Sequence, residues 1–552
     1  MRTDEEESKL LSRFVTNTKD DIFVLRNLPE VIKGALFSRY SRSVLGLREL
    51  LLKEFINDES RESQFDLIAA EGGSGEGSSQ LAAIKKAQSF YDRILDGYGD
   101  DSIGELGGAH LAAENISMLA AKAIEDRRIG GSPLEKSTRY IYFDQKVGGE
   151  YLFYREPILT ASNRDTLYLA TCNHLFDTYT ALKVRLTKKI EENHPLTGDM
   201  IEGAYKAAVR AKVCDALRGL LPASALTNVG VFGNGRFYEY LIRNLTIHPL
   251  FEMREIGRKS MEELSKVIPS FVRRADPSHH NQESFSKFHE AMGSEIKQQV
   301  AKHEAILAEM SADKEGNGPG AHLIDCDRDA PARVAAAMLF ADSNCSLAEL
   351  LEYCKQLPDL ELDSILEAGC SAREGRRHKS PRALEHAEFT FEILADFGCY
   401  RDLQRHRIMT QERQLLSCDH GYYIPHELSD PEMRAEYCAA LDKAKEAYDQ
   451  LVSDLPELRA EAQYIVPMAY NIRWYFRVNL RALQWMCELR STPQGHSTYR
   501  LIAQEMAKQV VDRFPVFKRF FKFVDFDGYE LGRLNQETKS HARAREKQGA
   551  GR

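Results

Sequence analysis

Apolar residues recur at every third and fourth position over much of the chain, and this spacing predicts amphipathic helices. The clearest helical runs cover residues 31–36, 109–124, 179–190, 385–403 and 502–511. Runs with strand-like composition are fewer and shorter, at residues 140–143 and 151–154. Many helices with a few strands predict an α+β fold, in which helices pack with a modest antiparallel or mixed sheet.

Two polar stretches interrupt these patterns. Residues 71–79 are rich in glycine and serine, which is typical of a flexible surface loop, and they lack the Gly-Lys-Ser/Thr of a phosphate loop. Residues 311–322 have the composition of a linker. We therefore divide the chain into a first domain, a helical and polar linker, a second domain and a polar tail expected to be disordered, at 1–275, 276–322, 323–535 and 536–552.

Several residues of the first domain recur in the second in the same order. Two sets carry this repeat: Glu105 and Arg127, which lie 22 positions apart as do Glu385 and Arg407, and the triplet Pro222, Asn234 and Arg236, which returns as Pro467, Asn479 and Arg481. Each triplet is followed by a helical run and a further arginine, Arg243 or Arg490. One such match arises by chance, but several in one order favour a duplicated domain.

Composition narrows the class of protein. The chain has 552 residues, of which 43% are hydrophobic and 28% charged, enough for two or three globular units. Its formal net charge of -9 gives no general attraction to nucleic acid or to an anionic membrane, so we expect neither partner and any anion site must be local. The acidic start and the lack of a long apolar run predict a cytoplasmic protein.

The ten cysteines show no Cys-x-x-Cys spacing, which favours reduced core thiols and gives a zinc site little support. Cys418 and Cys487 lie near the motifs described below and are predicted to be packing residues rather than nucleophiles. The aromatic residues at 474–476 and Trp485 fall on predicted helices at a spacing that suits a core, with a ring beside a bound ligand as the alternative.

The most distinctive local feature is a basic triplet, Arg405-His406-Arg407, just after the apolar run at 385–403. A histidine between two permanent positive charges is harder to protonate, and the cluster suits an anion such as a pyrophosphate or an electron-rich ring. The alternative is a solvated basic helix end that complements the helix dipole. The apolar stripe before the triplet is more typical of a core: Phe389, Ile393, Phe397 and Tyr400.

The surroundings of the triplet resemble the signature of flavin-dependent thymidylate synthases, the ThyX family. That family shows a G-H-x-S-x-x-E-H segment, a long helix, then R-H-R-x7-S and usually R-Y. Before the triplet this chain has His378, Ser380 and then Glu385-His386. After the triplet it departs from the pattern, since Ser417 fits only with two residues inserted and the R-Y pair reads Asp419-His420.

The first half resembles the same family in complementary places. Residues 132–140 are close to the S-x-N-E-x-S-x-R-Y ending and retain Glu135, Ser137 and Arg139. In contrast, Asp100 replaces the flavin-side histidine, and the R-H-R position near 126–129 holds no histidine. The arginine that the family places four residues before the proline is Arg218 in the first copy and Gln463 in the second.

The resemblance implies a division of labour between the copies, since the family builds its site where subunits of a tetramer meet. The second copy would bind the flavin through His378, Ser380, Arg405, His406, Arg407, Asn479 and Arg481. The first copy would bind the nucleotide through Glu135, Ser137, Arg139 and Arg218. The catalytic candidates are Arg490 and Arg243, which would stabilise charge on the uracil ring, with Ser137 and Ser417. The alternative interpretation is that Ser137, Arg139 and Arg218 are surviving fold determinants, with Arg139 in an ordinary salt bridge.

The activity implied by the resemblance is reductive C5 methylation of dUMP to dTMP. FAD carries the reducing equivalents, and methylenetetrahydrofolate and NADPH are the co-substrates. A homodimer that imitates the family tetramer is the expected assembly. Two alternatives stay open: a C5 methylase of UMP or another uridine nucleotide, and a non-catalytic relative that binds flavin or nucleotide.

Overall fold

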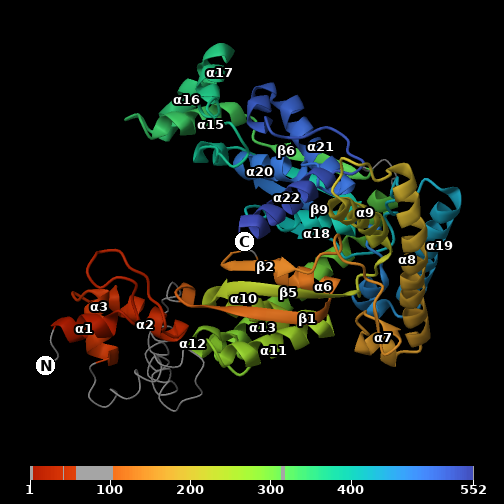
Figure 1. The fold of residues 1–552 in the computed structure, drawn as a ribbon, viewed down its shortest axis with the longest axis horizontal. Coiled ribbons are helices and arrows are strands. Elements are labelled where there is room, and N and C mark those ends of the chain that lie inside the picture. The colour runs from red at the N-terminus through yellow and green to blue at the C-terminus, as the bar shows by residue number, and fades with distance from the viewer. Residues whose placement is uncertain (1–3, 42, 57–103, 128, 313–317, 551–552) are drawn as a thin grey trace. The chain divides into compact units, whose positions relative to one another are not determined.

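A computed structural model describes residues 4–41, 43–56, 104–127, 129–312 and 318–550 of the chain (Figure 1). The structure separates into two units, each described by itself. Unit 1 comprises residues 1–114, 123–135 and 228–305, and unit 2 comprises 115–122, 136–227 and 306–552. Unit 2 therefore takes its residues from both halves of the sequence repeat. The Gly/Ser stretch at 71–79 and the motif around Asp100 lie outside the described residues.

Unit 1 is built around a three-stranded sheet with helices that follow its strands. The strand order is β1-β5-β2, with β1 at Gly108–Ser117, β5 at Leu226–Asn234 and β2 at Gly131–Glu135. β2 pairs antiparallel to β5. The helices are α1 (Asp4–Leu11), α2 (Glu30–Tyr40), α3 (Leu47–Leu50), η1 (Leu51–Ile56), α10 (Gly235–Thr246), α11 (Phe251–Ser265), α12 (Pro269–Val272) and α13 (His280–Lys302).

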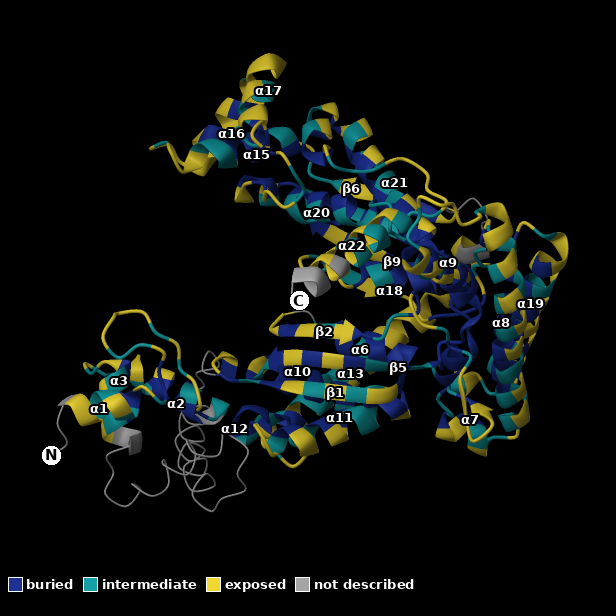
Figure 2. Ribbon diagram, viewed as in Figure 1, coloured by how far each residue is buried: buried dark blue, intermediate teal, exposed yellow. Residues whose placement is uncertain are grey.

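Unit 2 contains a four-stranded antiparallel sheet of order β6-β7-β9-β8. Its strands are β6 (Gly320–Cys326), β7 (Glu388–Asp396), β8 (Thr410–Arg413) and β9 (Asn471–Asn479). Burial alternates along β9, so one face of the strand lies in the core (Figure 2). The helices of the second copy are α15 (Ala330–Phe340), α16 (Leu347–Gln356), α17 (Asp359–Ala368), η6 (Arg382–His386), α18 (Phe397–Leu403), α20 (Leu480–Arg490) and α21 (Ser497–Arg513).

Residues of the first copy complete unit 2 through a helical layer. The long helices α8 (Asp165–Asn193) and α19 (Pro431–Asp454) pack against each other, and α9 (Glu202–Leu217) packs on α8. Short helical turns follow in both copies, η4 (Arg218–Leu220) and η8 (Glu461–Ile465). No described helix is long and apolar enough to span a bilayer.

The two copies meet in unit 2 around the repeated proline, where Pro222 forms a β-bridge with Pro467. The amide of Ala223 donates to the carbonyl of Val466, and the amide of Met468 donates to the carbonyl of Leu221, both at 2.9 Å. In the sequence repeat, 221 and 223 correspond to 466 and 468, so each hydrogen bond is the image of the other. The copies are therefore related here by a local pseudo-two-fold axis.

The predicted α+β class is confirmed, and the helical runs at 31–36, 179–190 and 502–511 lie in α2, α8 and α21. Two other predicted helices were wrong in their first halves. Residues 109–124 form most of β1 and then α6 (Met118–Glu125), and residues 385–403 form η6, β7 and α18.

The error has a physical reason. Phe389 and Ile393 are four residues apart, and a spacing of four satisfies both the two-residue period of a strand and the 3.6-residue period of a helix. The aromatic run 474–476, predicted to be helical, lies in β9. The predicted strand at 140–143 is not formed, since Tyr140 ends a turn and residues 141–143 are irregular, whereas Tyr151 does lie in a short strand, β4 (Glu150–Tyr151).

The tail predicted to be disordered from residue 536 was also wrong, since α22 spans Leu534–Ala550. Its sequence is rich in glutamate, lysine, arginine and alanine, which are good helix formers. The helix packs on α9, where a Cβ at Gly203 would lie 2.8 Å from Cε1 of His541. Packing of this kind stabilises a helix in a segment whose composition alone does not show whether it is helical or disordered.

Candidate functional site

A cavity of about 760 Å³ in unit 2 brings together the residues predicted to bind a cofactor. Three segments form it: the loop before β7, the turn after α18, and the helix α20 that follows β9. Its lining includes every predicted cofactor residue and one catalytic candidate: His378, Ser380, Arg405, His406, Arg407, Asn479, Arg481 and Arg490. The convergence was expected from the motif, and the roles of these residues stay predictions.

The cavity is strongly cationic, although the chain as a whole is acidic. Seven arginines and one lysine line it, against a single carboxylate, Glu385. Four of these cations were not predicted from the sequence: Arg373, Arg376, Lys379 and Arg382. The dense basic run from Arg373 to Lys379 was the signal that could have found them. Such a wall favours an anionic ligand with several negative oxygens.

The loop that carries His378 is fixed by a buried ion pair. Arg373 contacts Glu488 of α20 with both terminal nitrogens, and the Nη1 to Oε1 distance is 2.7 Å. Their side chains are 6% and 0% exposed. The Nε of Arg373 also donates to the carbonyl of His378 at 2.8 Å. A buried, bidentate pair therefore positions the rim of the cavity.

Asn479 and Arg481 have structural roles that recur in unit 1. The Asn479 side chain accepts the amide of Ala482 at 2.9 Å and caps α20, as Asn234 caps α10. Arg481 pairs with Glu385 at 2.8 Å. The corresponding pair in unit 1 is Arg236 with Glu105, at 2.7 Å. The repeated motif thus encodes a capped helix and an ion pair beside it.

His406 is held as a neutral ring. The Nε of Arg490 donates to Nε2 of His406 at 2.9 Å, so this nitrogen is an acceptor and the ring proton lies on Nδ1. Burial, followed by the charge of Arg490, lowers the pKa of His406 well below its usual range. The predicted direction is confirmed, but the charge responsible is on Arg490 rather than on the flanking arginines.

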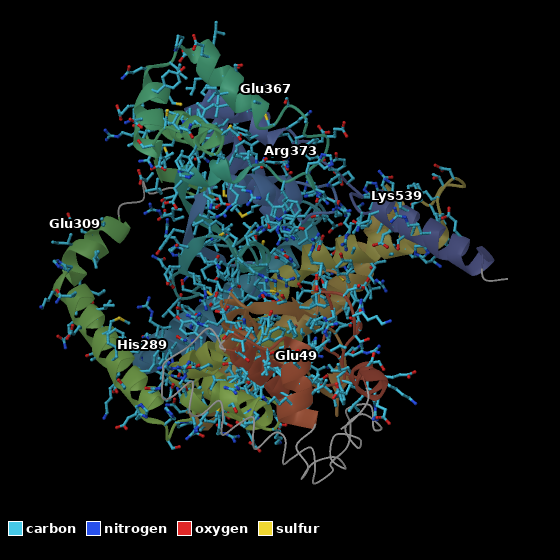
Figure 3. The ribbon with its side chains drawn as sticks, turned by 90° about the vertical axis from the view of Figure 1, so that its left-hand side faces the viewer. Glu49, His289, Glu309, Glu367, Arg373 and Lys539 are labelled. Atoms are coloured by element: carbon cyan, nitrogen blue, oxygen red, sulfur yellow. The ribbon has the colours of Figure 1, made fainter. Side chains whose placement is uncertain are left out.

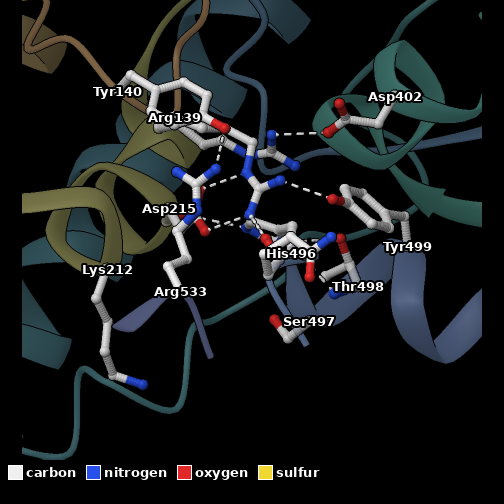
Figure 4. Close-up of polar contacts among 12 residues, drawn as sticks. Arg139, Tyr140, Lys212, Asp215, Asp402, His496, Ser497, Thr498, Tyr499 and Arg533 are labelled. Carbon is white, nitrogen blue, oxygen red and sulfur yellow. Dashed lines mark hydrogen bonds and ion pairs between the residues drawn. The ribbon is translucent and has the colours of Figure 1, made fainter. Parts of the chain in front are cut away.

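The predicted nucleotide residues Arg139 and Arg218 are buried in a cluster that adjoins the cavity lining. Arg139 and the cavity residue Arg490 lie over the same Tyr499 ring, at 5.3 and 5.4 Å from its centre. Figure 4 shows the contacts of Arg139 in this cluster. Arg139 pairs with Asp215 through two hydrogen bonds of 2.7 Å. Nη1 of Arg218 lies 3.0 Å from the Asp402 carboxylate. Each guanidinium is thus already compensated by an aspartate. This arrangement does not support a substrate role, and the alternative interpretation, a salt bridge for Arg139, describes its contacts.

Burial and charge shift the pKa values of this cluster in opposite directions. Burial alone would raise the pKa of Asp402, but the neighbouring guanidiniums, Arg218 foremost, hold it far below its ordinary value. Asp396 has a raised pKa because its burial outweighs the attraction of Arg218. His496 accepts the amide of Thr498 at 3.2 Å, and its Nε2 lies 3.1 Å from the carbonyl of Asp215.

Acid is expected to destabilise the fold through His496. Burial, followed by the charge of Arg218, lowers the pKa of His496 to about 3, whereas histidine in an unfolded chain titrates near about 6.5. Between these values only the unfolded state takes up the proton. This proton uptake should therefore lower the free energy of unfolding by about 1.4 kcal/mol for each pH unit below about 6.5. Buried His406, whose pKa is also lowered, adds to the total slope. Urea denaturation at about pH 7 and about pH 5 measures this slope.

The control for this slope is His426→Gln, because the His426 side chain is 57% exposed. That variant should keep the acid slope of the parent, whereas His496→Gln should reduce it by about 1.4 kcal/mol per pH unit and leave the part that comes from buried His406. If the parent and both variants have equal slopes, the protonation of His496 does not contribute to the acid destabilisation.

The remaining site candidates are not among the described residues that line the cavity. Ser137 accepts the amide of Arg139, and buried Ser417 accepts the amide of Asp419. Arg243 belongs to unit 1, where it donates to the carbonyl of Asn281 and lies 4.3 Å from the Phe285 ring. Glu135 is buried at the end of β2 in unit 1. These contacts are structural, and the catalytic assignment of Ser137, Ser417 and Arg243 stays a prediction.

Trp485 on α20 lines the cavity, and Nζ of Lys379 lies 4.0 Å from its ring. The alternative reading of this aromatic residue therefore has structural support, whereas Trp474 is buried in β9. Cys418 and Cys487 are buried, and burial raises the pKa of both thiols. Both therefore fit packing better than nucleophilic chemistry.

A model of the thymidylate synthase complementing protein family matches residues 59–270 and again residues 323–516. These two regions cover more than half of the chain, which therefore belongs to this family and carries its domain in tandem. The resemblance to flavin-dependent thymidylate synthases that the motifs indicated is confirmed.

Two of the relatives reported below match over nearly the whole length of both chains. The chain is 54% identical over 534 residues to a UPF0159 protein of Chlamydia pneumoniae, covering 97% of each. It is 30% identical over 538 residues to a UPF0159 protein of Thermoplasma acidophilum, covering 93% of this chain and 99% of the relative. A flavin-dependent thymidylate synthase of Clostridium tetani is 29% identical over 157 residues, covering 24% of this chain and 61% of that protein.

Among solved structures, a UMP/dUMP methylase, PolB, from Streptomyces cacaoi bound with 5-Br UMP matches with 17% sequence identity. The match covers 37% of this chain and 94% of that one, with a TM-score of 0.28.

Proposed function

We propose that the chain is a flavin-dependent methylase that adds a methyl group to the uracil C5 of a uridine nucleotide, with dUMP as the first candidate. Methylenetetrahydrofolate and NADPH would be its co-substrates. The observation that carries the proposal is the convergence of seven motif residues in one cationic cavity. Membership of the thymidylate synthase complementing protein family supports the same reaction class.

The residues of the cavity fit FAD. Its volume of about 760 Å³ suits a large cofactor. The diphosphate of FAD carries negative oxygens that guanidinium groups bind well, and Arg405 and Arg407 are placed to do so. Trp485 offers an aromatic surface for a ring system. When bound, FAD supplies the redox chemistry that side chains lack, while the protein orients it and excludes water.

The protein's own part in this chemistry lies in charge and position. Arg490 is held by its hydrogen bond to His406 and faces the same cavity. A fixed guanidinium at this place would stabilise negative charge that develops on a bound ring. The neutral state of His406 keeps its Nε2 available as the acceptor that fixes Arg490.

A second candidate function, flavin binding without methyl transfer, has its own specific observation. Arg139 and Arg218, the arginines expected to meet a nucleotide phosphate, are buried, and each is paired with a partly buried aspartate. A phosphate dianion would have to displace Asp215 or Asp402 from these arginines. If that does not occur, the chain binds flavin in the cationic cavity and leaves the nucleotide unbound.

The visible absorption spectrum of the purified full chain tests whether the chain binds a flavin. We expect flavin bands, or quenching of flavin fluorescence when FAD is added to the colourless protein. Turnover of dUMP and of UMP with methylenetetrahydrofolate and NADPH then separates the candidates. Methylation of either nucleotide supports the methylase. Flavin binding without turnover supports the non-catalytic flavin-binding protein. A chain that binds no flavin contradicts both candidate functions.

A further inference from the structure

A second, smaller cavity lies in unit 2, and residues 529–533 of the C-terminal segment form part of its lining. Its volume is about 60 Å³, and it shares no described lining residue with the cationic cavity. A single water molecule needs about 10 to 15 Å³ of such space. The small cavity therefore has room for a group the size of phosphate but not for a whole nucleotide.

Arg533 places an uncompensated charge at this cavity. The residue lines the cavity and is only 8% exposed. Its guanidinium carbon lies 3.9 Å from the centre of the Tyr140 ring, and its Nη2 donates to the Tyr140 hydroxyl (Figure 4). Its Nε and Nη1 are buried without a hydrogen-bond partner, and it forms no ion pair with any residue that the structure describes. A buried charge in this state is costly unless a ligand compensates it.

The other charged groups around the cavity are engaged with one another. Each carboxylate of the lining already meets another cation: Glu427 and Glu530 lie 3.3 and 3.1 Å from Lys212, and Asp215 lies 2.7 Å from Arg139. Arg500 of the lining lies 3.5 Å from Asp525. Since the Glu530 side chain is 63% exposed, water screens its charge. Among the described residues of the lining, Arg533 is thus the cation without a counter-charge.

Two helix starts add positive potential at the same place. Helix α21 begins at Ser497, which lines the cavity. Helix α22 begins at Leu534, directly after Arg533, and Figure 3 labels Lys539 on it. Each helix has 17 residues. The N-terminal end of a helix carries a partial positive charge that favours anions. Both helix starts and the buried guanidinium therefore favour the same kind of ligand.

We propose that this cavity binds a phosphate group through Arg533. The phosphate supplies the counter-charge that the guanidinium lacks and accepts hydrogen bonds from its unpartnered nitrogens. Arg533 lies outside the two regions that match the family model, so the site is separate from the proposed flavin site and does not depend on its activity. Inorganic phosphate and the phosphate end of a nucleotide present the same oxygens here, and the experiment separates them.

Urea denaturation of the full chain, with and without inorganic phosphate at constant ionic strength, tests the proposal. A ligand that binds only the folded chain raises the unfolding midpoint. We expect phosphate to raise the midpoint of the parent in a saturable way. In Arg533→Gln, the dissociation constant obtained from this shift should rise at least about tenfold, because a charge-assisted contact is lost. Without phosphate, this variant should be no less stable than the parent, since it removes an uncompensated buried charge.

Two control variants assign the effect to this cavity. Arg543→Gln removes an exposed arginine of α22 and should respond to phosphate like the parent. The double variant Arg405→Ala with Arg407→Ala removes two charges from the cationic cavity, which also attracts anions. It should keep the part of the phosphate response that depends on Arg533.

The source of the phosphate group follows from titration with dUMP and with deoxyuridine. If Arg533→Gln weakens the binding of dUMP but not that of deoxyuridine, the group belongs to a nucleotide. If it weakens neither while the response to inorganic phosphate is lost, the ligand is a free anion.

Two results would overturn the site. One is a parent chain whose unfolding midpoint does not respond to phosphate. The other is a midpoint that Arg533→Gln lowers by the same amount with and without phosphate. Arg533 would then only hold the C-terminal segment against Tyr140.

Discussion

Replacing Arg218 with alanine should lower the free energy of unfolding by about 3 to 5 kcal/mol. Arg218 and Asp402 form an ion pair whose side chains are only 4% and 15% exposed. Without the guanidinium, the Asp402 carboxylate remains in a largely dry site with its strongest counter-charge removed. Leaving one member of a buried pair costs far more than the pair contributes as a whole. Urea denaturation at neutral pH measures the loss.

Two controls show whether the loss of stability in Arg218→Ala comes from an uncompensated buried charge. Arg477→Ala removes an arginine from a pair with Glu388 whose side chains are 61% and 44% exposed, and should cost about 0 to 1 kcal/mol. The double variant Arg218→Met with Asp402→Leu removes both charges and should recover most of the stability. A loss in Arg218→Ala no larger than that in Arg477→Ala would contradict the buried cluster.

The same loss should depend on pH. In the parent chain, the guanidiniums hold the pKa of Asp402 far below its ordinary value, so its stabilising contribution is present above about pH 4 and declines below it. In Arg218→Ala the pKa of Asp402 rises, and the folded state accepts a proton more readily. The difference between parent and variant should therefore shrink as the pH falls below about 4.

The site residues that belong to a known motif could be predicted from the sequence. Ion pairs between residues that are distant in the sequence could not. The basic triplet and the repeated Asn-x-Arg led to the cationic cavity, because the resemblance to the ThyX signature assigns these residues to one flavin site although they lie far apart in the sequence. The partners of the buried arginines were not found. Arg139 meets Asp215 across 76 positions, and Arg218 meets Asp402 across 184 positions and between the two copies. No local pattern encodes such pairs.

The duplication explains how the copies diverged. Residue Arg218 of the first copy corresponds to Gln463 of the second. Gln463 needs no counter-charge: its Oε1 accepts the amide of Leu416 at 3.1 Å and its Nε2 donates to the carbonyl of Ala460 at 2.8 Å. In the second copy, the side chain at this buried position is hydrogen-bonded to backbone groups. In the first copy, it is paired with Asp402 of the second copy. A chain with a single copy of the domain has only one residue at this position, so it could not hold both an arginine and a glutamine there.

Replacing both Arg405 and Arg407 with alanine should weaken FAD binding about a hundredfold or more. Both residues line the cationic cavity, and each charge-assisted hydrogen bond to a phosphate contributes about 1.5 to 3 kcal/mol. Since both side chains are exposed, the variant should unfold at the same urea concentration as the parent. Equilibrium titration of the apoprotein with FAD, followed by flavin fluorescence, gives the dissociation constant.

Arg434→Ala is the matched control for this loss, because Arg434 is an exposed arginine of α19 that does not line the cavity as described. It should bind FAD like the parent, which excludes a general effect of net charge. Raising the salt concentration should narrow the gap between parent and double variant, because screening weakens the arginine contacts that only the parent makes. If the double variant and the control bind FAD equally well, the cavity is not the flavin site, and the cationic wall must serve another anion.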